Sequence, residues 1–286
     1  MPTNQVVIAD ENAIAFGASN PITVWASDVY LQHAYDVIQS TYGDTVTVKP
    51  KNLLKFGLNP GVGTSECTIM GFVGSEVAET YATANSIDSI VSGNDTNHQT
   101  MVVEGHTVSG SELTFVVQNV TLTGQTPALL PTPLFRATRL YNNDTSNLAS
   151  SSIVYVYDSS ATAVDTGVPQ TAAGVHIIAN AAENQSLKAS TAFSNIDYGL
   201  ITHVYADVNK QKAAQVDIRL KIREFGKVFR TQFVRTVASD SNGILDFPLI
   251  PYLIVPKNAD VIITATASTT AVSVSGGFNT LIATVT

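Results

Sequence analysis

The chain has 286 residues, a formal net charge of −8 at pH 7 and only 13% charged residues, against 44% hydrophobic residues. This length allows one large domain or two of ordinary size, each with a real core. Recurrent apolar residues exclude a disordered chain, and the negative charge argues against a general nucleic-acid-binding protein, because phosphates are repelled by such a field.

Residues 1–20 are predicted to form an arm that orders against a neighbouring molecule, and residues 21–26 (PITVWA) to form a first strand. The one helix candidate runs from Ser27 to Tyr42, where Leu31, Ala34, Tyr35 and Ile38 recur near a single helical face. We therefore expect at most one short helix, close to the N-terminus.

From Thr45 onward, short apolar runs alternate with Gly, Asn, Asp and Pro clusters. Strands at such short intervals predict a sandwich or barrel rather than βαβ units. In the run LTFVVQNVTL the apolar parity changes, which predicts a bulge near Gln118-Asn119. The segment Asn142 to Ser152 is the most linker-like of the chain. The predicted fold is all-β, with two tandem jelly-roll-like β-sandwich domains at residues 21–145 and 150–286.

The clearest structural signal is the segment 214–236 (AQVDIRLKIREFGKVFRTQFVRT). Val216, Ile218, Leu220 and Ile222 alternate with charged residues, as in a strand with one buried and one solvated face. Gly226 marks a turn before a second apolar and basic run. The segment therefore predicts a β-hairpin with a basic outer face.

Three interpretations of this basic face stay open: a nucleic-acid surface, a solvated face with cross-strand ion pairs, and an interface with an acidic surface. Residues 1–148 hold 5 Lys/Arg against 13 Asp/Glu, whereas residues 149–286 hold 10 of each. The acidic half of another copy is thus one possible partner. Changing Arg219, Lys221 and Arg223 to Ser is expected to leave the monomer folded but weaken assembly. The candidate subunit-interface residues are Arg219, Lys221, Arg223, Lys227 and Arg230.

Chemical signatures are sparse. The single cysteine, Cys67, permits neither an intrachain disulfide nor a cysteine-based zinc site, and the five histidines are scattered. No HExxH motif, GxSxG elbow or Walker lysine occurs. We therefore predict no catalytic, cofactor-binding or metal-binding residues. The N-terminus lacks signal-peptide features and no run reaches about 18 apolar residues, so we expect a soluble protein with no membrane partner.

Several C-terminal stretches resemble the final β-sandwich of virion structural proteins from tailed bacteriophages. These stretches are ENQSLKAST, DYGLITHVYADVNK, VDIRLKIREFGKVFR, ILDFPL, VPKNADVIITATAS and VSGGFNTLI. The earlier stretches SIDSIVSGNDTNHQTMVVEGH and VTLTGQTPALLPTPLFRATRLYNND resemble the preceding β-domain of such proteins. The resemblance spans about two thirds of the chain and leaves residues 1–80 unmatched. It implies a homo-oligomer without enzymatic activity and transfers no individual binding residue.

The leading expectation is a capsid decoration or cement protein of a tailed phage. It would act as a homo-oligomer, expected to be a trimer, that binds the major capsid protein in virions assembled in the host cytoplasm; no nucleic-acid partner is expected. One alternative is a head- or tail-attached fibre that binds a receptor. A second is a carbohydrate-binding or carbohydrate-active β-sandwich, with Trp25, Tyr35 and Tyr42 as a sugar platform and Glu76 and Glu79 as acids.

Overall fold

A computed structural model describes residues 26–46, 51–71, 79–209, 214–238, 243–269 and 272–285. The predicted arm, residues 21–25 of the predicted first strand, including Trp25, and Glu76 lie outside these residues, whereas Ala26 begins the helix. The described part is built of antiparallel sheets with one α-helix near the N-terminus, which confirms the predicted all-β sandwich class.

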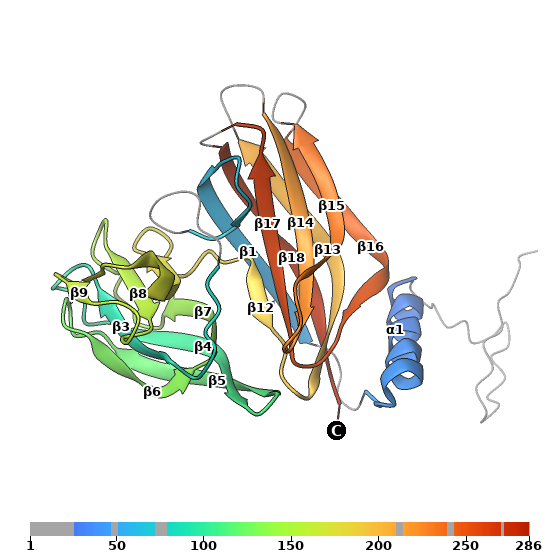
Figure 1. Ribbon diagram of the computed structural model, residues 1–286, viewed down its shortest axis with the longest axis horizontal. Coiled ribbons are helices and arrows are strands. Elements are labelled where there is room, and N and C mark those ends of the chain that lie inside the picture. Colours follow the sequence, from blue (N-terminus) through green and yellow to red (C-terminus); the bar gives the residue numbers. More distant parts are fainter. Residues whose placement is uncertain are drawn as a thin grey trace, which may run out of the picture.

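The larger body is a sandwich of two sheets (Figure 1). The first sheet has the order β1-β18-β13-β16, with bounds Lys51–Val62, Val272–Thr284, Asp197–Asn209 and Ile244–Val255. The second sheet has the order β12-β17-β14-β15, with bounds Ser190–Ala192, Ala259–Ala267, Gln215–Glu224 and Arg230–Ala238. Strand β2 (Cys67–Thr68) also pairs with β17.

Strands β2 and β12 are two halves of one strand along β17. Cys67 and Thr68 pair with Ala265 and Thr264, while β12 pairs with the residues from Ile262 to Asp260. Counted as one, these halves make an eight-stranded sandwich whose sheets have the chain orders 1-8-3-6 and 2-7-4-5. This is the strand order of a jelly roll, the double-sheet fold found in viral capsid and lectin domains.

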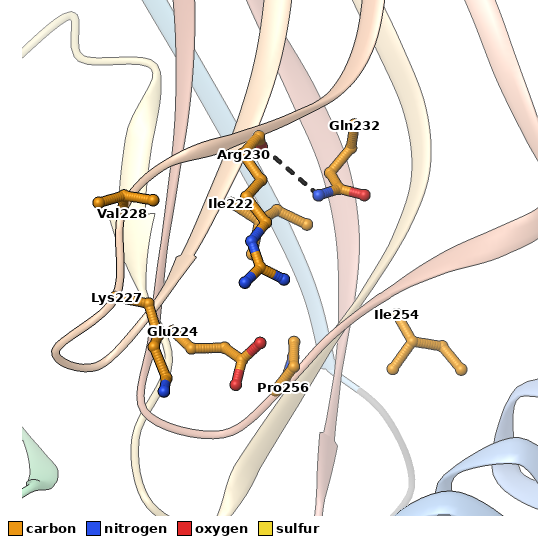
Figure 2. A pocket seen from close by; sticks show the side chains of 8 residues that line it. All are labelled: Ile222, Glu224, Lys227, Val228, Arg230, Gln232, Ile254 and Pro256. Carbon is orange, nitrogen blue, oxygen red and sulfur yellow. Dashed lines mark hydrogen bonds between the residues drawn. The ribbon is translucent and has the colours of Figure 1, made fainter.

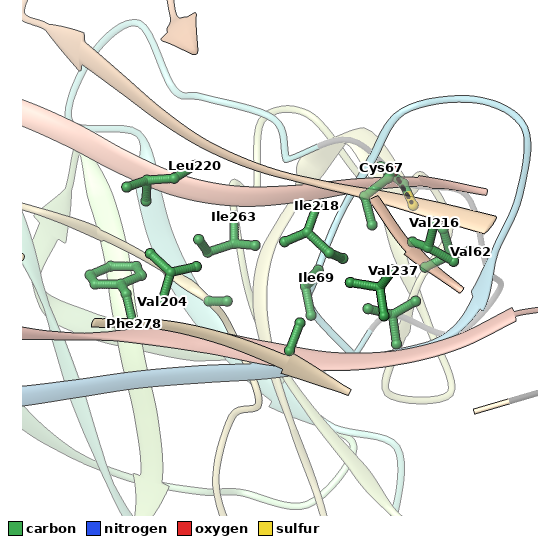
Figure 3. Close-up of a cluster of buried hydrophobic side chains, with 14 of the residues drawn as sticks. Val62, Cys67, Ile69, Val204, Val216, Ile218, Leu220, Val237, Ile263 and Phe278 are labelled. Atoms are coloured by element: carbon green, nitrogen blue, oxygen red, sulfur yellow. Dashed lines mark hydrogen bonds between the residues drawn. The ribbon is translucent and has the colours of Figure 1, made fainter. Parts of the chain in front are cut away.

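The space between the two sheets holds the main hydrophobic core (Figure 3). Ile218 and Leu220 of β14 face Val204 of β13 and Phe278 of β18, and all four side chains are fully buried. The alternation of buried and partly exposed residues along β14 confirms the predicted strand. Its pairing with β15 confirms the hairpin, and Gly226 takes the positive φ of 71° that the turn requires.

A second unit is inserted into the middle of the split strand between β2 and β12. Met70 forms a bridge with Lys188, and the Gly71 amide donates to the Leu187 carbonyl, so the outgoing and returning chains are hydrogen-bonded to each other. We call the described residues 79–187 the inserted module. In Figure 1 it is the green and yellow body beside the jelly roll. It has its own core, which includes Ile90, Met101 and Leu140.

The inserted module contains two main sheets and a small ribbon. The first sheet has the order β11-β8-β3-β6, with bounds Val175–Asn180, Ile153–Tyr157, Ile87–Ser92 and Ala128–Leu134. The second has the order β5-β4-β7, with bounds Glu112–Thr121, Thr100–Ser109 and Arg136–Asn142. The ribbon joins β9 (Val164–Asp165) and β10 (Val168–Pro169), and a short 3₁₀ helix spans Ala172–Gly174.

The sheets do not divide the chain at the expected linker. Strand β8, which follows residues 142–152, pairs with β3, which precedes them, and β1 pairs with the final strand β18. One unit is therefore inserted into the other, instead of two units in tandem at 21–145 and 150–286. The linker-like composition marks a surface loop within the inserted module, because loops and linkers favour the same small polar residues.

The predicted bulge in β5 is wrong. Pairing between β4 and β5 is continuous from Thr100–Thr121 to Ser109–Glu112. The apolar parity changes because the strand is covered on different faces at its two ends. Leu113 packs in a cluster with Phe135 and Ala192 beside the jelly roll, whereas Val120 faces the core of the inserted module.

The predicted helix is confirmed as α1 (Ala26–Tyr42). Ala34 and Ile38 are buried against Tyr198 and Leu200 of β13. The helix thus covers part of the outer face of the first jelly-roll sheet, next to β16 (Figure 1).

Candidate functional site

Three of the five predicted interface residues are paired within the chain. They lie on the outer face of the second jelly-roll sheet, where an Arg219 amino group donates to Asp217 at 2.8 Å and the Lys221 ammonium pairs with Glu66. Arg223 pairs with Asp260, and its guanidinium lies 4.0 Å from the Tyr81 ring centroid. These contacts correspond to the ion-paired interpretation of the basic face.

The contacts of Arg223 overturn one expectation. Changing Arg219, Lys221 and Arg223 to Ser was expected to leave the monomer fold intact. However, Asp260 is buried, with a side chain only 6% exposed, and Arg223 is one of its two cationic partners. Removing one partner of a buried ion pair is strongly destabilising, so this replacement is expected to weaken the fold as well.

The other two predicted residues, Lys227 and Arg230, are exposed at the hairpin turn. With Glu224 they line a pocket of about 160 Å³ whose apolar wall includes Ile254 and Pro256. Figure 2 shows the side chains of Glu224, Lys227 and Arg230 extending into this space. The pocket has two cations and one carboxylate, so its net charge is positive and favours an acidic partner. Their role in a subunit interface stays a prediction.

The residues that join the inserted module to the jelly roll form a buried ionic network. Arg136 of β7 donates from Nε to Asp260 of β17 at 2.9 Å, and both side chains are less than 10% exposed. Arg136 also donates to the carbonyls of Ala82 and Phe135 at 3.0 and 2.8 Å. Asp260 thus connects Arg136 of the inserted module with Arg223 of the jelly roll, and it holds the two units together.

A second part of this junction surrounds two buried lysines. Lys188 donates to the Ala137 carbonyl at 2.8 Å and pairs with Glu79 at 2.7 Å. Lys55 donates to the Thr138 carbonyl at 2.5 Å. Burial, reinforced by the nearby charge of Lys188, lowers the pKa of Lys55 from 10.5 to about 7.

Sequence patterns did not single out Lys55, Arg136, Lys188 or Asp260, and they proposed other roles for Arg223 and Glu79. Lys55 shares strand parity with Leu53 and Gly57, and Asp260 begins the apolar run DVIITATA. The sequence signal that could have found them is a charged residue at a position where the alternation of a strand calls for an apolar one. Such a residue is expected to be buried, and a buried charge requires a partner. Which partner it meets depends on how the inserted module returns to the jelly roll.

A cavity of about 230 Å³ lies beside this network, and we call it the junction pocket. The first residues of the inserted module contribute Glu79 and Tyr81, and the jelly roll contributes Lys221, Ile262 and, from its hairpin, Phe229. Glu66 pairs with Lys221 at its wall. Burial raises the pKa of the Glu66 carboxyl, but hydrogen bonds from Lys221 and Thr264 outweigh burial and leave that pKa below its usual value.

The proposed sugar platform on the N-terminal segment is not assembled by the described residues. Tyr35 packs partly buried against the cluster beneath α1, and the Tyr42 ring lies 5.3 Å from the Tyr198 ring. Glu79, the proposed acid, is held by Lys188 at the junction. Among the described residues, no group of His, Cys, Asp and Glu gathers that could hold a metal ion, and no helix is long and apolar enough to cross a bilayer.

Comparison with known proteins yields few matches. No protein-family model and no curated protein matches this chain. Among solved structures, the infectious bursal disease virus VP2 subviral particle is 12% identical over 88% of this chain and 78% of that chain, with a TM-score of 0.23. The Gt strain structure of that virus is 11% identical over 87% of this chain and 77% of that chain, with a TM-score of 0.20. Such TM-scores are too low to assign fold or function.

Proposed function

We propose that this chain is a non-enzymatic virion structural protein that decorates or cements the capsid of a tailed phage as a homo-oligomer, with a trimer as the expected state. The observation that carries the proposal is the lateral edge of the jelly roll formed by β15 and β16. Each of these strands ends its sheet, and Figure 1 shows them side by side. Edge strands offer backbone groups and side chains to another chain.

The lateral edge is unusually apolar for a solvated surface. Val234, Ile244 and Ile250 are 51%, 61% and 58% exposed. Between the sheets, Phe233 of β15 packs on Phe247 of β16, with ring centroids 5.0 Å apart. These exposed apolar side chains flank the edge on the two outer faces of the sandwich, Val234 beside Arg219 and Ile244 beside Asp207, and a partner that covers the edge would bury them.

A second copy of the chain is the occupant that fits this edge. Lys227, Arg230 and Arg235 lie along its β15 side, and no ion pair among the described residues involves them. Residues 79–187, in contrast, hold 9 Asp/Glu against 2 Lys/Arg. A contact between the basic edge of one copy and the acidic inserted module of the next is heterologous, and such contacts form a ring, such as the expected trimer, when the rotation between copies closes.

Two further features support a structural role in virions. The jelly-roll strand order recurs in viral capsid domains, and the C-terminal stretches resemble phage virion proteins. Because lectin domains share this strand order, a fibre protein that binds a receptor is the alternative. Location in the particle and binding of the purified protein to host cells separate the two.

Native mass spectrometry of the full chain tests whether the lateral edge is an assembly contact. We expect wild type to form a homo-oligomer and Ile244→Asp to shift it toward monomer, since a charge would be buried in the contact. Leu54→Asp is the matched control, because Leu54 is 52% exposed on β1, which ends the first jelly-roll sheet on the side opposite to β16. A monomeric wild type, or equal oligomers of all three proteins, contradicts the proposed interface.

The capsid role is tested on purified particles. We expect the protein to copurify with intact heads in fixed proportion to the major capsid protein. Detection only in isolated tails overturns the decoration proposal and favours the fibre alternative. Lys227→Ser with Arg230→Ser is expected to weaken assembly and reduce its dependence on salt, because exposed charges act through a screened field.

A further inference from the structure

The junction pocket has two buried polar atoms that the fold leaves without partners. Among the described residues, Glu79 Oε2 and the Tyr81 hydroxyl have no hydrogen-bond partner, although each atom is shielded from solvent. Native proteins pair almost all such groups, since an unpaired buried group costs about 1–3 kcal/mol. Both residues line the cavity, so a small shift of either side chain toward a bound molecule would let that molecule complete its hydrogen bonds.

The state of each group defines what it offers to a ligand. Glu79 Oε1 is occupied by Lys188 at 2.7 Å, so Oε2 remains as a hydrogen-bond acceptor. Burial, with the nearby charges of Glu79 and Asp260, raises the pKa of Tyr81 well above 10, so its hydroxyl keeps its proton and can donate. The pocket therefore presents a carboxylate acceptor and a hydroxyl donor two residues apart along one segment.

The remaining walls are apolar or charge-balanced. Phe229 stands beside Tyr81, with ring centroids 5.3 Å apart, and Ile262 forms a buried part of the wall. The carboxylates of Glu66 and Glu79 are each paired with a lysine. A charged ligand would find no unpaired opposite charge there, and moving its charge out of water would be costly. The walls favour a neutral ligand with one apolar face and several hydroxyl groups.

The size of the cavity fits one small ring. An engineered protein cavity of about 150 Å³ accepts benzene, and pockets for drug-sized ligands begin near 300 Å³. The junction pocket, at about 230 Å³, lies between these values. The pocket is also accessible at one side, because the side chains of Lys221 and Glu66 are 20% and 38% exposed.

We infer that the junction pocket binds a neutral polyhydroxylated ring, that is, one saccharide residue, with its apolar face toward Phe229 and its hydroxyl groups on Glu79 and Tyr81. This function goes beyond the proposed capsid role and does not depend on it. The pocket lies where the inserted module meets the jelly roll, so the ligand would contact both units.

The test is saturation-transfer NMR on the full chain with D-glucose, D-galactose, L-rhamnose and N-acetyl-D-glucosamine at millimolar concentration. D-Glucosamine and D-glucuronate serve as charged analogues of the same ring. We expect at least one neutral sugar to bind and both charged analogues to bind more weakly. Absence of binding by all the neutral sugars, or preference for a charged analogue, overturns the inference.

The variant Tyr81→Phe tests whether the sugar binds in the junction pocket. The variant keeps the ring and removes only the hydroxyl, so we expect affinity to fall about tenfold, the effect of one hydrogen bond. Its thermal midpoint should not fall, because the hydroxyl has no protein partner to lose. Tyr155→Phe, in the inserted module, is the matched control and should leave affinity unchanged. Unchanged affinity in Tyr81→Phe would place the sugar elsewhere and refute the assignment.

Discussion

The substitution Asp260→Asn tests whether the buried ionic network holds the inserted module on the jelly roll. Asn has nearly the shape of Asp but no negative charge. In the wild type, Asp260 accepts hydrogen bonds from Arg136 Nε at 2.9 Å and from Arg223 Nε at 3.0 Å. The variant leaves these two guanidinium groups facing each other, without an anion, in a largely buried site.

The magnitude follows from burial and from the contacts that remain. Removing one partner of a buried pair typically costs about 3–5 kcal/mol. Arg136 keeps its bonds to the Ala82 and Phe135 carbonyls, which places the expected loss near the lower limit, at about 3 kcal/mol. Since 1 kcal/mol shifts Tm by about 2–4 °C in chains of 150–250 residues, Tm should fall by about 6–12 °C.

Urea unfolding followed by circular dichroism gives the free energy, and Asp217→Asn is the matched control. Asp217 also pairs with an arginine of the same sheet, Arg219 at 2.8 Å, but its side chain is 38% exposed. Solvent screens such a pair, so this control should lose no more than about 1 kcal/mol. A similar loss in both variants would refute the reasoning, because burial would then make no difference to the value of the carboxylate.

Three further outcomes concern buried positions. The folded-state pKa of Lys55 is lowered to about 7 from 10.5, so between pH 7 and 10.5 the unfolded state binds more protons than the folded state. The unfolding free energy of the wild type should therefore rise with pH in this range. Urea titrations at several pH values should show a smaller rise for the variant Lys55→Met. Burial lowers the pKa of His106 to about 4 from 6.5, so the unfolding free energy should fall as the pH drops from 6.5 to 4. The fall should be less steep in His106→Phe, and equal pH slopes for the two proteins would contradict this prediction. Gly57→Ala should lower Tm by the equivalent of about 1–3 kcal/mol or more, because its Cβ would lie 2.0 Å from the Ile69 carbonyl oxygen. The control Gly71→Ala, with its nearest contact at 3.6 Å, should change Tm much less.

The hairpin at 214–236 shows what periodicity can predict. The strict alternation of apolar and charged residues in β14 predicts the strand, its buried face and its charged face together, because successive side chains of a strand point to opposite sides. The partners of the charged face were not predictable. Glu66 reaches Lys221 only after the chain has folded across the sheet, and Asp260 reaches Arg223 only through the pairing of β14 with β17.

The inserted module shows why local composition misplaced the boundary. The polar loop at residues 142–152 resembles a linker, whereas the chain departs near Gly71, directly after the apolar run CTIM, and returns near Leu187. They are hydrogen-bonded to each other and continue a strand. An insertion into a strand is visible only when both halves are seen to pair with β17.

The sequence by itself determined the all-β class, the N-terminal helix and the basic hairpin, because each depends on periodicities and turn residues within one short segment. Only the tertiary structure decided the jelly-roll order, the nesting of one unit in the other, the lateral edge of β15 and β16 and the junction pocket. These features arise from contacts between residues far apart in the chain. Local patterns specify how a segment folds and which face it buries, but they do not specify which distant segment covers that face.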